Sequence, residues 1–404
     1  MRRVAVTLAM LLGSGWAAAS AAAQPPPPAA EDRPTLKIGP LEVRPRLVFS
    51  NIGFDNNVFN EPENPKRDFT ATVSPDLTLS VRTGFLRLSY LSGTDLVYFR
   101  QYKEERSTSR RLAARADFDF PLVKPFVSYG AGNITGRPGN EVDRRVRHRP
   151  EVLSGGARFV ISSRTSLLLS GQRSSIEYAP GVEFRGVELA RTLNHSTTSY
   201  DTAFGFQATP LTSLSLIAGI ENTSFAAAPE RNSRSYRIAP SISISPLGLL
   251  TGTATVGFRH FEGRGGALPS YSGLYAGGGL GTVILDRYRV QTTFTRDIRY
   301  SYEETLPYYV QTAGTGSLAT YLAAGFDVRI HGGVESMRYR AFDGSEPGQD
   351  RVTTYGAGVG YRIAERVTLV LTAEKARRQS TRDVIREYQN DRIFATLTWG
   401  GNIR

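Results

Sequence analysis

Cysteine is absent from the 404 residues, so the chain has neither a disulfide framework nor a thiolate metal site. Histidine occurs four times, methionine three times and tryptophan twice. No internal run approaches the ~20 apolar residues of a membrane helix, and no stripe recurs every ~3.6 residues after the first segment. What remains is rich in glycine, tyrosine and phenylalanine, a composition that favours strands and tight turns over helices.

The N-terminal segment has the pattern of a secretory signal peptide. Arg2 and Arg3 precede an apolar stretch, which ends in small residues before Gln24. We expect a signal peptide over residues 1–23, a Pro-rich periplasmic linker over 24–40 and an outer-membrane β-barrel over 41–404. The two arginines account for two of the +12 net charges, so the processed chain carries +10.

Apolar and polar residues alternate along the rest of the chain. In residues 68–82, odd positions such as Val73 and Leu79 are apolar, and even positions such as Thr78 and Arg82 are polar. A period of two indicates a strand with one apolar face and one polar face. The stretch is much longer than the ~5–6 residues of a typical globular strand, which favours strands that cross a membrane.

The breaks between these strands alternate between short and long. Thr83–Gly84 and residues 162–164 are short, whereas residues 136–149 and 178–189 are long and polar. This rhythm is typical of an up-and-down barrel with tight turns at its periplasmic end and long loops outside. The predicted strands are 42–58, 68–82, 85–102, 106–120, 124–136, 147–162, 165–178, 190–208, 212–226, 233–246, 249–263, 270–284, 287–303, 307–319, 322–341, 350–363, 366–381 and 386–399.

The predicted fold class is therefore all-β: a transmembrane antiparallel up-and-down β-barrel of about 18 strands, within a range of 16–18. The apolar face would meet lipid, the polar face would line a wet lumen, and closure leaves no unpaired sheet edge in the bilayer. A soluble propeller is disfavoured because no repeat of ~40–50 residues is present. The alternating last segment ends at Trp399 and resembles the strand that the barrel-assembly machinery recognises, although GGNIR follows it.

The segment VRPRLVFSNIGFDNNVFN, residues 43–60, resembles the N-terminal signature of the type 2 β-barrel porin family of Gram-negative outer-membrane proteins. The similarity extends to VSPDLTLSVR and LSYLSGTDLVYFRQY and covers roughly the first quarter of the chain. Members often occur beside exopolysaccharide genes, so the resemblance implies an outer-membrane pore and a role in polysaccharide export. The matching residues are Asn51, Gly53, Asp55, Asn57, Val58, Phe59, Pro75, Tyr90 and Tyr98.

Arginines on the polar face are the main functional signal. Their excess favours passage of an anionic solute or an acidic glycan, while solvation and bracing of the wall is the alternative. The acidic residues of the same face partly cancel their charge. The residues predicted to line the lumen are Arg82, Arg87, Arg115, Arg237, Arg259, Arg289, Arg299, Arg362 and Arg392, together with Asp68, Asp76, Asp95, Asp117, Asp119 and Asp297.

Two other groups have competing interpretations. Asn51, Asp55, Asn56 and Asn57 supply oxygens that suit Ca²⁺, but turn chemistry is the preferred interpretation because the cluster has a single carboxylate. A set of tyrosines near strand ends predicts an interfacial aromatic girdle. Phe99 and Phe394 are the inward aromatics that a sugar-stacking path would need. The girdle tyrosines are Tyr288, Tyr300, Tyr302, Tyr308, Tyr309, Tyr321, Tyr355 and Tyr361.

Catalysis has little support in the sequence. His195 beside Ser196 and Ser199 is the nearest approach to the serine–histidine pair of a barrel lipid hydrolase. We expect no enzyme, no cofactor, no metal and no nucleic-acid partner. The predicted function is an outer-membrane pore for solute or exopolysaccharide, with membrane lipid, the assembly machinery and periplasmic export proteins as partners. The alternative is a non-conducting structural or surface-binding barrel, and an inward-folded loop such as the charged segment 140–151 would distinguish the two.

Overall fold

The structure is a computed structural model that describes residues 36–245, 250–285 and 287–400. The predicted signal peptide and most of the predicted linker lie outside these ranges, as do parts of the turns near residues 248 and 286 and the last four residues. Leu36–Ile38, at the end of the predicted linker, forms the short strand β1, which pairs with residues 41–43.

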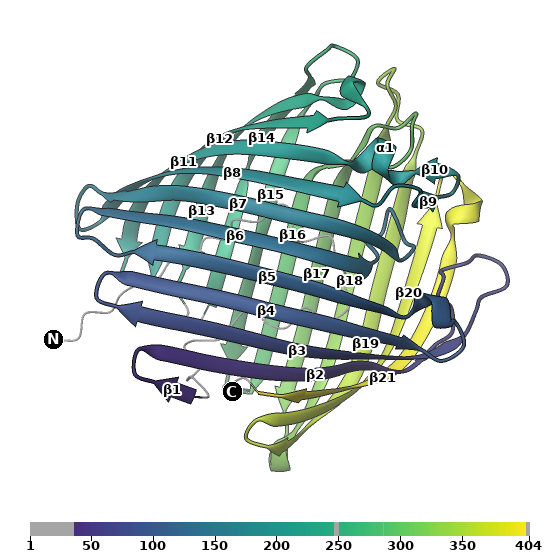
Figure 1. Cartoon of the computed structure of the whole chain (residues 1–404), viewed down its shortest axis with the longest axis horizontal. Helices are drawn as coiled ribbons and strands as arrows, with labels where there is room; N and C mark the ends of the chain where they lie inside the picture. The colour runs from purple at the N-terminus through teal and green to yellow at the C-terminus, as the bar shows by residue number, and fades with distance from the viewer. Residues whose placement is uncertain (1–35, 246–249, 286, 401–404) are drawn as a thin grey trace.

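Eighteen long antiparallel strands form the wall of the molecule (Figure 1). Each pairs with its neighbours in chain order, and the last strand returns to pair with the first long one, which closes the barrel. The count and nearly all positions match the predicted strands. The strands are β2 (Leu41–Asp55), β3 (Asp68–Thr83), β4 (Leu86–Phe99), β5 (Ser107–Phe118), β6 (Val123–Gly136), β7 (Val146–Val160), β8 (Thr165–Tyr178), β11 (His195–Thr209), β12 (Thr212–Phe225), β13 (Ser233–Ile244), β14 (Leu250–Gly263), β15 (Tyr271–Ile284), β16 (Tyr288–Tyr300), β17 (Tyr308–Tyr321), β18 (Phe326–Arg340), β19 (Gln349–Ala364), β20 (Val367–Ser380) and β21 (Tyr388–Trp399).

In the described part of the chain, helical structure is confined to the connections. The segment 179–194 contains the small hairpin β9 (Glu183–Phe184) and β10 (Val187–Glu188) and the helix α1 (Leu189–Leu193). The strand predicted to begin at residue 190 therefore begins at His195. Single helical turns are η1 (Lys103–Glu105), η2 (Pro229–Arg231), η3 (Ala323–Gly325) and η4 (Val384–Arg386). Within the described ranges, no helix has the length and apolar character needed to cross a membrane.

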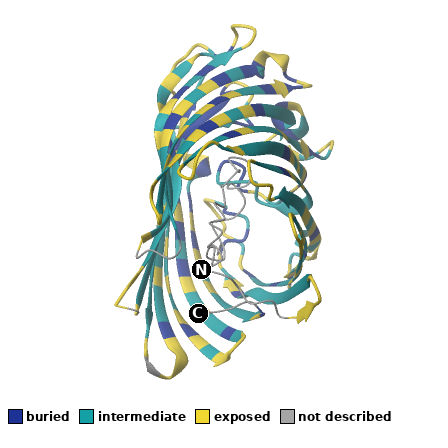
Figure 2. Cartoon of the chain, turned by 90° about the vertical axis from the view of Figure 1, so that its left-hand side faces the viewer, coloured by how far each residue is buried: buried dark blue, intermediate teal, exposed yellow. Residues whose placement is uncertain are grey.

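The alternation of the sequence appears as two different faces of the wall. Large apolar side chains such as Phe204, Leu216 and Val256 are exposed on the outer face. Charged and hydroxyl side chains of the alternate positions point inward, where many are partly buried by their neighbours. Viewed from the end with the tight turns, the barrel has an elongated oval outline, and loop segments lie inside the ring of strands (Figure 2).

The wall departs from a regular barrel where β15 meets β16. Their ladder runs only from the pair Ala276–Arg296 to the pair Ile284–Tyr288, so residues 271–275 and 297–300 lack a partner across this boundary. Beyond it, the end of β16 bends inward, and Tyr300 packs on Phe225 and Phe261.

This bend corrects part of the aromatic girdle predicted from the sequence. Tyr302, Tyr308 and Tyr309 are buried, and Tyr300 packs inside the barrel rather than at an interface. Tyr355 and Tyr361 are exposed on the outer wall. Alternation along a strand predicts which side chains face lipid only where the strand is part of the barrel wall. The tip of the β16–β17 hairpin bends out of the wall, so the prediction fails there.

Candidate pore constriction

The connection between β6 and β7, residues 137–145, folds into the barrel and reaches the opposite wall. Asn140 Nδ2 donates to Glu335 Oε2 of β18 at 2.7 Å, and Arg378 of β20 donates to Asn140 O at 2.6 Å. Ser301, in the bent β16–β17 connection, donates to Glu141 Oε1 at 2.7 Å. These contacts join parts of the chain that are 160 to 238 residues apart, and they place the segment across the lumen.

A buried ionic cluster holds this segment in place. Arg378 is fully buried and pairs with Asp350 of β19 and with Asp143 of the inserted segment, at 2.5 and 3.0 Å. Arg386 of η4 donates to the carbonyl of Glu141 at 2.7 Å and pairs with Glu303 at 3.1 Å. Breaking a buried ion pair leaves an uncompensated charge, so the cluster fixes the mutual position of three connections.

An apolar cluster covers the outer side of the same region. Val142 of the inserted segment packs with Phe184, Leu189 and Leu193 of segment 179–194 and with Tyr302. Each of these side chains is buried. The long-loop end of the barrel is therefore restricted by packed loops with a core of their own.

Glu141 is a buried carboxylate of this constriction. Its side chain accepts hydrogen bonds from Ser301 Oγ and from Tyr302 N, and it is only 4 % exposed. Burial raises the pKa of Glu141 to about 7, although the nearby guanidinium of Arg386 opposes the shift. Its protonation state therefore changes near neutral pH.

Ion pairs bridge the inner face in the half of the barrel nearer the long loops. Arg237 pairs with Asp201 at 2.6 Å, and Arg259 pairs with Asp297 at 2.6 Å and with Glu221. This chain links β11, β12, β13, β14 and β16, and it contains three residues that the sequence placed in the lumen. Because each arginine faces carboxylates, their charges largely cancel.

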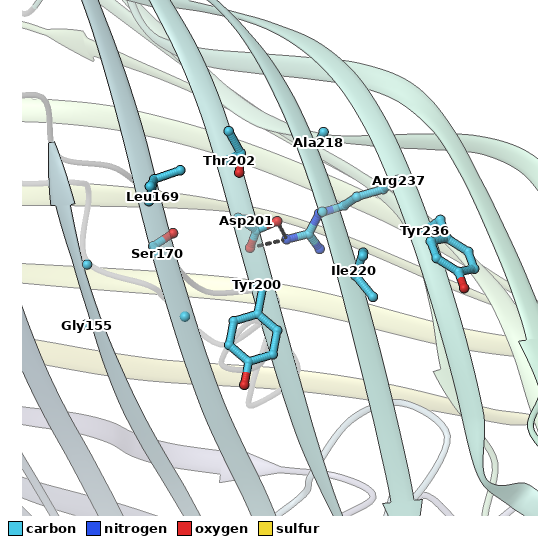
Figure 3. Close-up of a pocket in the computed structure, with 13 residues that line it drawn as sticks. Gly155, Leu169, Ser170, Tyr200, Asp201, Thr202, Ala218, Ile220, Tyr236 and Arg237 are labelled. Atoms are coloured by element: carbon cyan, nitrogen blue, oxygen red, sulfur yellow. Dashed lines mark hydrogen bonds and ion pairs between the residues drawn. The ribbon is translucent and has the colours of Figure 1, made fainter. Parts of the chain in front are cut away.

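One of these bridges spans a glycine that lies between the two partners. Asp201, Gly219 and Arg237 lie side by side on β11, β12 and β13. A Cβ at Gly219 would lie 2.1 Å from Asp201 Oδ1 and 3.0 Å from Arg237 Nε. Figure 3 shows this pair beside Tyr200. The pair lines a hollow of about 700 Å³, in which several of the lining residues are glycines without side chains.

The same arrangement recurs in the first strands. Asp76 of β3 and Arg111 of β5 are joined at 2.5 Å across Gly93 of β4, whose Cβ would lie 2.4 Å from Asp76 Oδ1. Arg111 also pairs with Asp95 at 2.6 Å. The sequence analysis predicts neither Arg111 as a lumen residue nor the glycine between the two partners. Such a bridge can be recognised only when the register of three neighbouring strands is known.

The end of the barrel with the tight turns differs from the middle. Arg82 and Arg87 flank the β3–β4 turn, Arg158 lies near the end of β7, and Arg362 lies near the end of β19. Among the residues that the structure describes, none of these four forms an ion pair. The inner rim at this end is therefore positively charged.

The remaining predicted arginines have individual surroundings. Arg115 pairs with Asp117 and lies over the ring of Phe126. Arg289 lies over Tyr321, and Arg299 donates to Gln311 at 3.1 Å. Arg392 lies 3.5 Å from Asp55 and 3.7 Å from Glu374.

The signature residues of the first strand form a turn network. Asn51 has a positive φ at a bulge of β2, and Gly53 is packed so closely on β21 that a Cβ would meet Ile393 O at 2.0 Å. Asp55 accepts from Asn57 N at 2.9 Å, and Asn57 donates to Gln389 O. Phe59 packs edge-on against Tyr102. These oxygens are used within the turn, and no group of three or more His, Asp or Glu in the described ranges is arranged to hold a metal ion.

The histidines have no catalytic arrangement. His195 Nδ1 contacts Leu193 O at 2.6 Å, and its ring packs on Phe225. His260 contacts Ser272 at 2.7 Å, but it does so as a cross-strand neighbour on the outer face. The side chains of His260 and Glu262 are 42 % and 46 % exposed, so the site lacks the fixed, desolvated geometry that activates a serine.

No family model and no curated protein matches the chain, so the resemblance to type 2 β-barrel porins stays a prediction. Among solved structures, the chain is similar to a BenF-like porin from Pseudomonas fluorescens Pf-5, with a TM-score of 0.51 and 12% identity over 89% of this chain and 98% of that chain. It is also similar to Pseudomonas aeruginosa OpdK with vanillate, with a TM-score of 0.49 and 9% identity over 89% and 98% of the two chains. The FrpB iron transporter from Neisseria meningitidis gives a TM-score of 0.44 and 10% identity over 84% and 62%. At these identities the likeness to the BenF-like porin shows the closed 18-strand barrel fold.

Proposed function

We propose that the protein is an outer-membrane channel that passes small anionic solutes. The observation that carries this proposal is the rim of inward arginines at the tight-turn end: Arg82, Arg87, Arg158 and Arg362. Cations held at the mouth of a low-dielectric pore raise the local concentration of anions. The paired arginines deeper in the barrel brace the wall, so the rim supplies the selectivity.

The apolar outer wall supports the membrane location. Side chains such as Phe204, Leu216, Ile238, Val256 and Val359 are exposed around the barrel, and water would solvate them poorly. Paired strands of ~9–11 residues suffice to cross a bilayer, and every long strand meets that length. Membrane lipid and the barrel-assembly machinery are the partners that this location requires.

The inserted segment 137–145 favours small solutes over a polymer. Arg378 of the opposite wall and Ser301 of the β16–β17 connection both form hydrogen bonds with it. The segment therefore takes up space inside the barrel that a glycan chain would need. The exopolysaccharide role implied by the family resemblance would require this segment to leave the lumen. Periplasmic export proteins would then be the partners that move it.

The test is the reversal potential of the protein in planar bilayers under a KCl gradient. Replacing Arg82, Arg87, Arg158 and Arg362 together by Gln should shift the reversal potential toward cation preference. The matched control replaces four exposed arginines of the outer face by Gln: Arg110, Arg149, Arg173 and Arg377. An equal shift in both variants would show that the rim has no special role.

A structural barrel without conductance is the second candidate. The observation that favours it is the apolar cluster of Val142, Phe184, Leu189, Leu193 and Tyr302. These side chains pack at the long-loop end as in the core of a soluble domain, which would block the pore there. In that case bilayers containing folded protein would show no conductance. Removal of the inserted segment would then create conductance where the native chain has none.

A further inference from the structure

A small basic pocket lies on the outer face where the long-loop ends of β15, β16, β17 and β18 meet. Arg296, Arg338 and Arg340 line it, together with Tyr271, Val310, Thr312 and Ser336. Its volume is about 30 Å³, room for about two water-sized groups. Cationic and hydroxyl donors in so small a space suit the oxygens of a phosphate.

The positive charge of this pocket is neutralised only in part. Arg296 donates to the hydroxyls of Thr312 and Tyr271, at 2.5 and 3.5 Å. Arg340 pairs with Glu346, and Arg338 is exposed. Across the described part of the chain, neither Arg296 nor Arg338 forms an ion pair with a carboxylate.

The pocket continues into a wider basic surface on the same outer face. Arg351 is the cross-strand neighbour of Ser336, and Arg377 lies on the next strand. Both are exposed, and within the described residues neither has a carboxylate partner. The opposite end of the outer wall is different, because the outward positions near the tight turns are apolar or small, as at Leu318, Val328 and Val359.

The height of the pocket along the wall corresponds to the edge of a bilayer. The β15–β16 ladder has nine paired positions, from Ile284–Tyr288 to Ala276–Arg296. A strand needs ~9–11 residues to cross the apolar layer, so the ladder ends where headgroups begin. There the unpaired edges of residues 271–275 and 297–300 can be solvated, and Arg296 lies at that level.

We propose that this pocket binds the phosphate of a membrane lipid headgroup, in the leaflet that surrounds the long-loop end. The inference rests on the membrane location in the proposed function, but not on conduction. The phosphate would occupy the pocket of Arg296, Arg338 and Arg340, and the acyl chains would lie along the apolar wall below. Headgroup recognition here is electrostatic and bidentate, as guanidinium groups permit.

The experiment measures lipid retained by the full folded chain in native mass spectrometry. The protein is held in maltoside micelles doped with dioleoyl phosphatidic acid or with dioleoylglycerol, which lacks the phosphate. We expect retention of phosphatidic acid alone, reduced about tenfold or more when Arg296, Arg338 and Arg340 are changed together to Gln. The control changes Arg110, Arg149 and Arg173 to Gln, which removes equal charge from the outer face of β5, β7 and β8.

Four outcomes would overturn the inference. Equal losses in both triple variants would indicate diffuse attraction, and equal retention of dioleoylglycerol would indicate no phosphate recognition. Displacement by inorganic phosphate at equal concentration would indicate a free-anion site, because a lipid gains affinity from its chains. If the triple variant does not show the heat-modifiable mobility of a folded barrel, Arg338→Gln alone should still lower retention. Anion conductance without phosphatidic acid retention would contradict this inference and leave the proposed function intact.

Discussion

The carboxylate of Glu141 accepts a hydrogen bond from Ser301 Oγ at 2.7 Å, although the two residues are 160 positions apart. This contact joins the inserted segment of the β6–β7 connection to the bent tip of the β16–β17 hairpin. The contact is buried, and it lies among the packed loops inside the barrel. This contact therefore helps to hold the inserted segment in the lumen.

The first prediction concerns pH. The pKa of Glu141 is about 7 in the inserted position, against 4.5 for a solvated glutamate, so insertion is favoured while the side chain is protonated. The stabilisation of the inserted position by protonated Glu141 is fully present below pH ~4.5 and is lost as the pH rises through ~7. The free energy of insertion changes by roughly 3 kcal/mol over this range. Conductance should therefore rise between pH 5 and 8.

Glu141→Gln should make the conductance independent of pH over the same range, because the amide stays neutral. Arg386, Glu303 and Tyr302 face the same carboxylate and remain in both proteins. Glu304→Gln is the control, since Glu304 is exposed and pairs with Arg191 outside the cluster. A pH response that survives in Glu141→Gln would assign the titration to another group.

The second prediction concerns the buried cluster. Arg378→Met leaves Asp350 and Asp143 without their main partner, and such a loss typically costs ~3–5 kcal/mol. The variant should unfold at a lower temperature in a heat-modifiable gel assay. Arg377→Met, its exposed neighbour on the outer face, should change the midpoint little. Equal midpoints for both variants would show that the cluster does not stabilise the barrel.

The third prediction concerns the glycine bridges. Gly219→Ala places a Cβ against Asp201 and Arg237, and overpacking of this kind costs ~1–3 kcal/mol. Gly277→Ala is the matched change in β15, where a Cβ meets nothing within 4 Å. The unfolding midpoint in urea should fall for the first variant only. A neutral Gly219→Ala would mean that the pair shifts without cost.

The fourth prediction concerns the inserted segment. Replacing residues 138–143 by two glycines removes Glu141, Val142 and Asp143 from the lumen, so single-channel conductance should increase. The paired positions Gly136 and Val146 keep the hairpin closed. Deleting residues 343–347, an exposed loop between β18 and β19, is the control and should leave conductance unchanged. An unchanged conductance after the first deletion would show that the segment does not limit the path.

Much of the wall is predictable from sequence, because alternation is a local property. Strands such as 165–178 and 212–226 were predicted within about a residue, since the outward apolar side chains recur at every second position. Even the inward direction of Arg259 follows from that period. Its neutralisation by Asp297 and Glu221 does not, because it depends on register across several strands.

The constriction cannot be predicted from alternation, because it also depends on contacts between residues far apart in the sequence. The charged segment 140–151 was recognised as able to line a pore, but its insertion depends on Arg378 and Arg386, more than 200 residues away. The inward bend of β16 at Tyr300 likewise leaves no mark in the alternation. Contacts between loops are specific and long-range, whereas the period of a strand is repeated along its whole length.

The most direct test of the central claim is the reversal potential of the unmodified protein in a planar bilayer, measured across a tenfold KCl gradient at low total salt. The uncompensated rim of Arg82, Arg87, Arg158 and Arg362 predicts a value on the anion-selective side. The preference should shrink near ~1 M salt, where the screening length falls to ~3 Å. A cation-selective reversal potential, or folded protein that never conducts, would contradict the account.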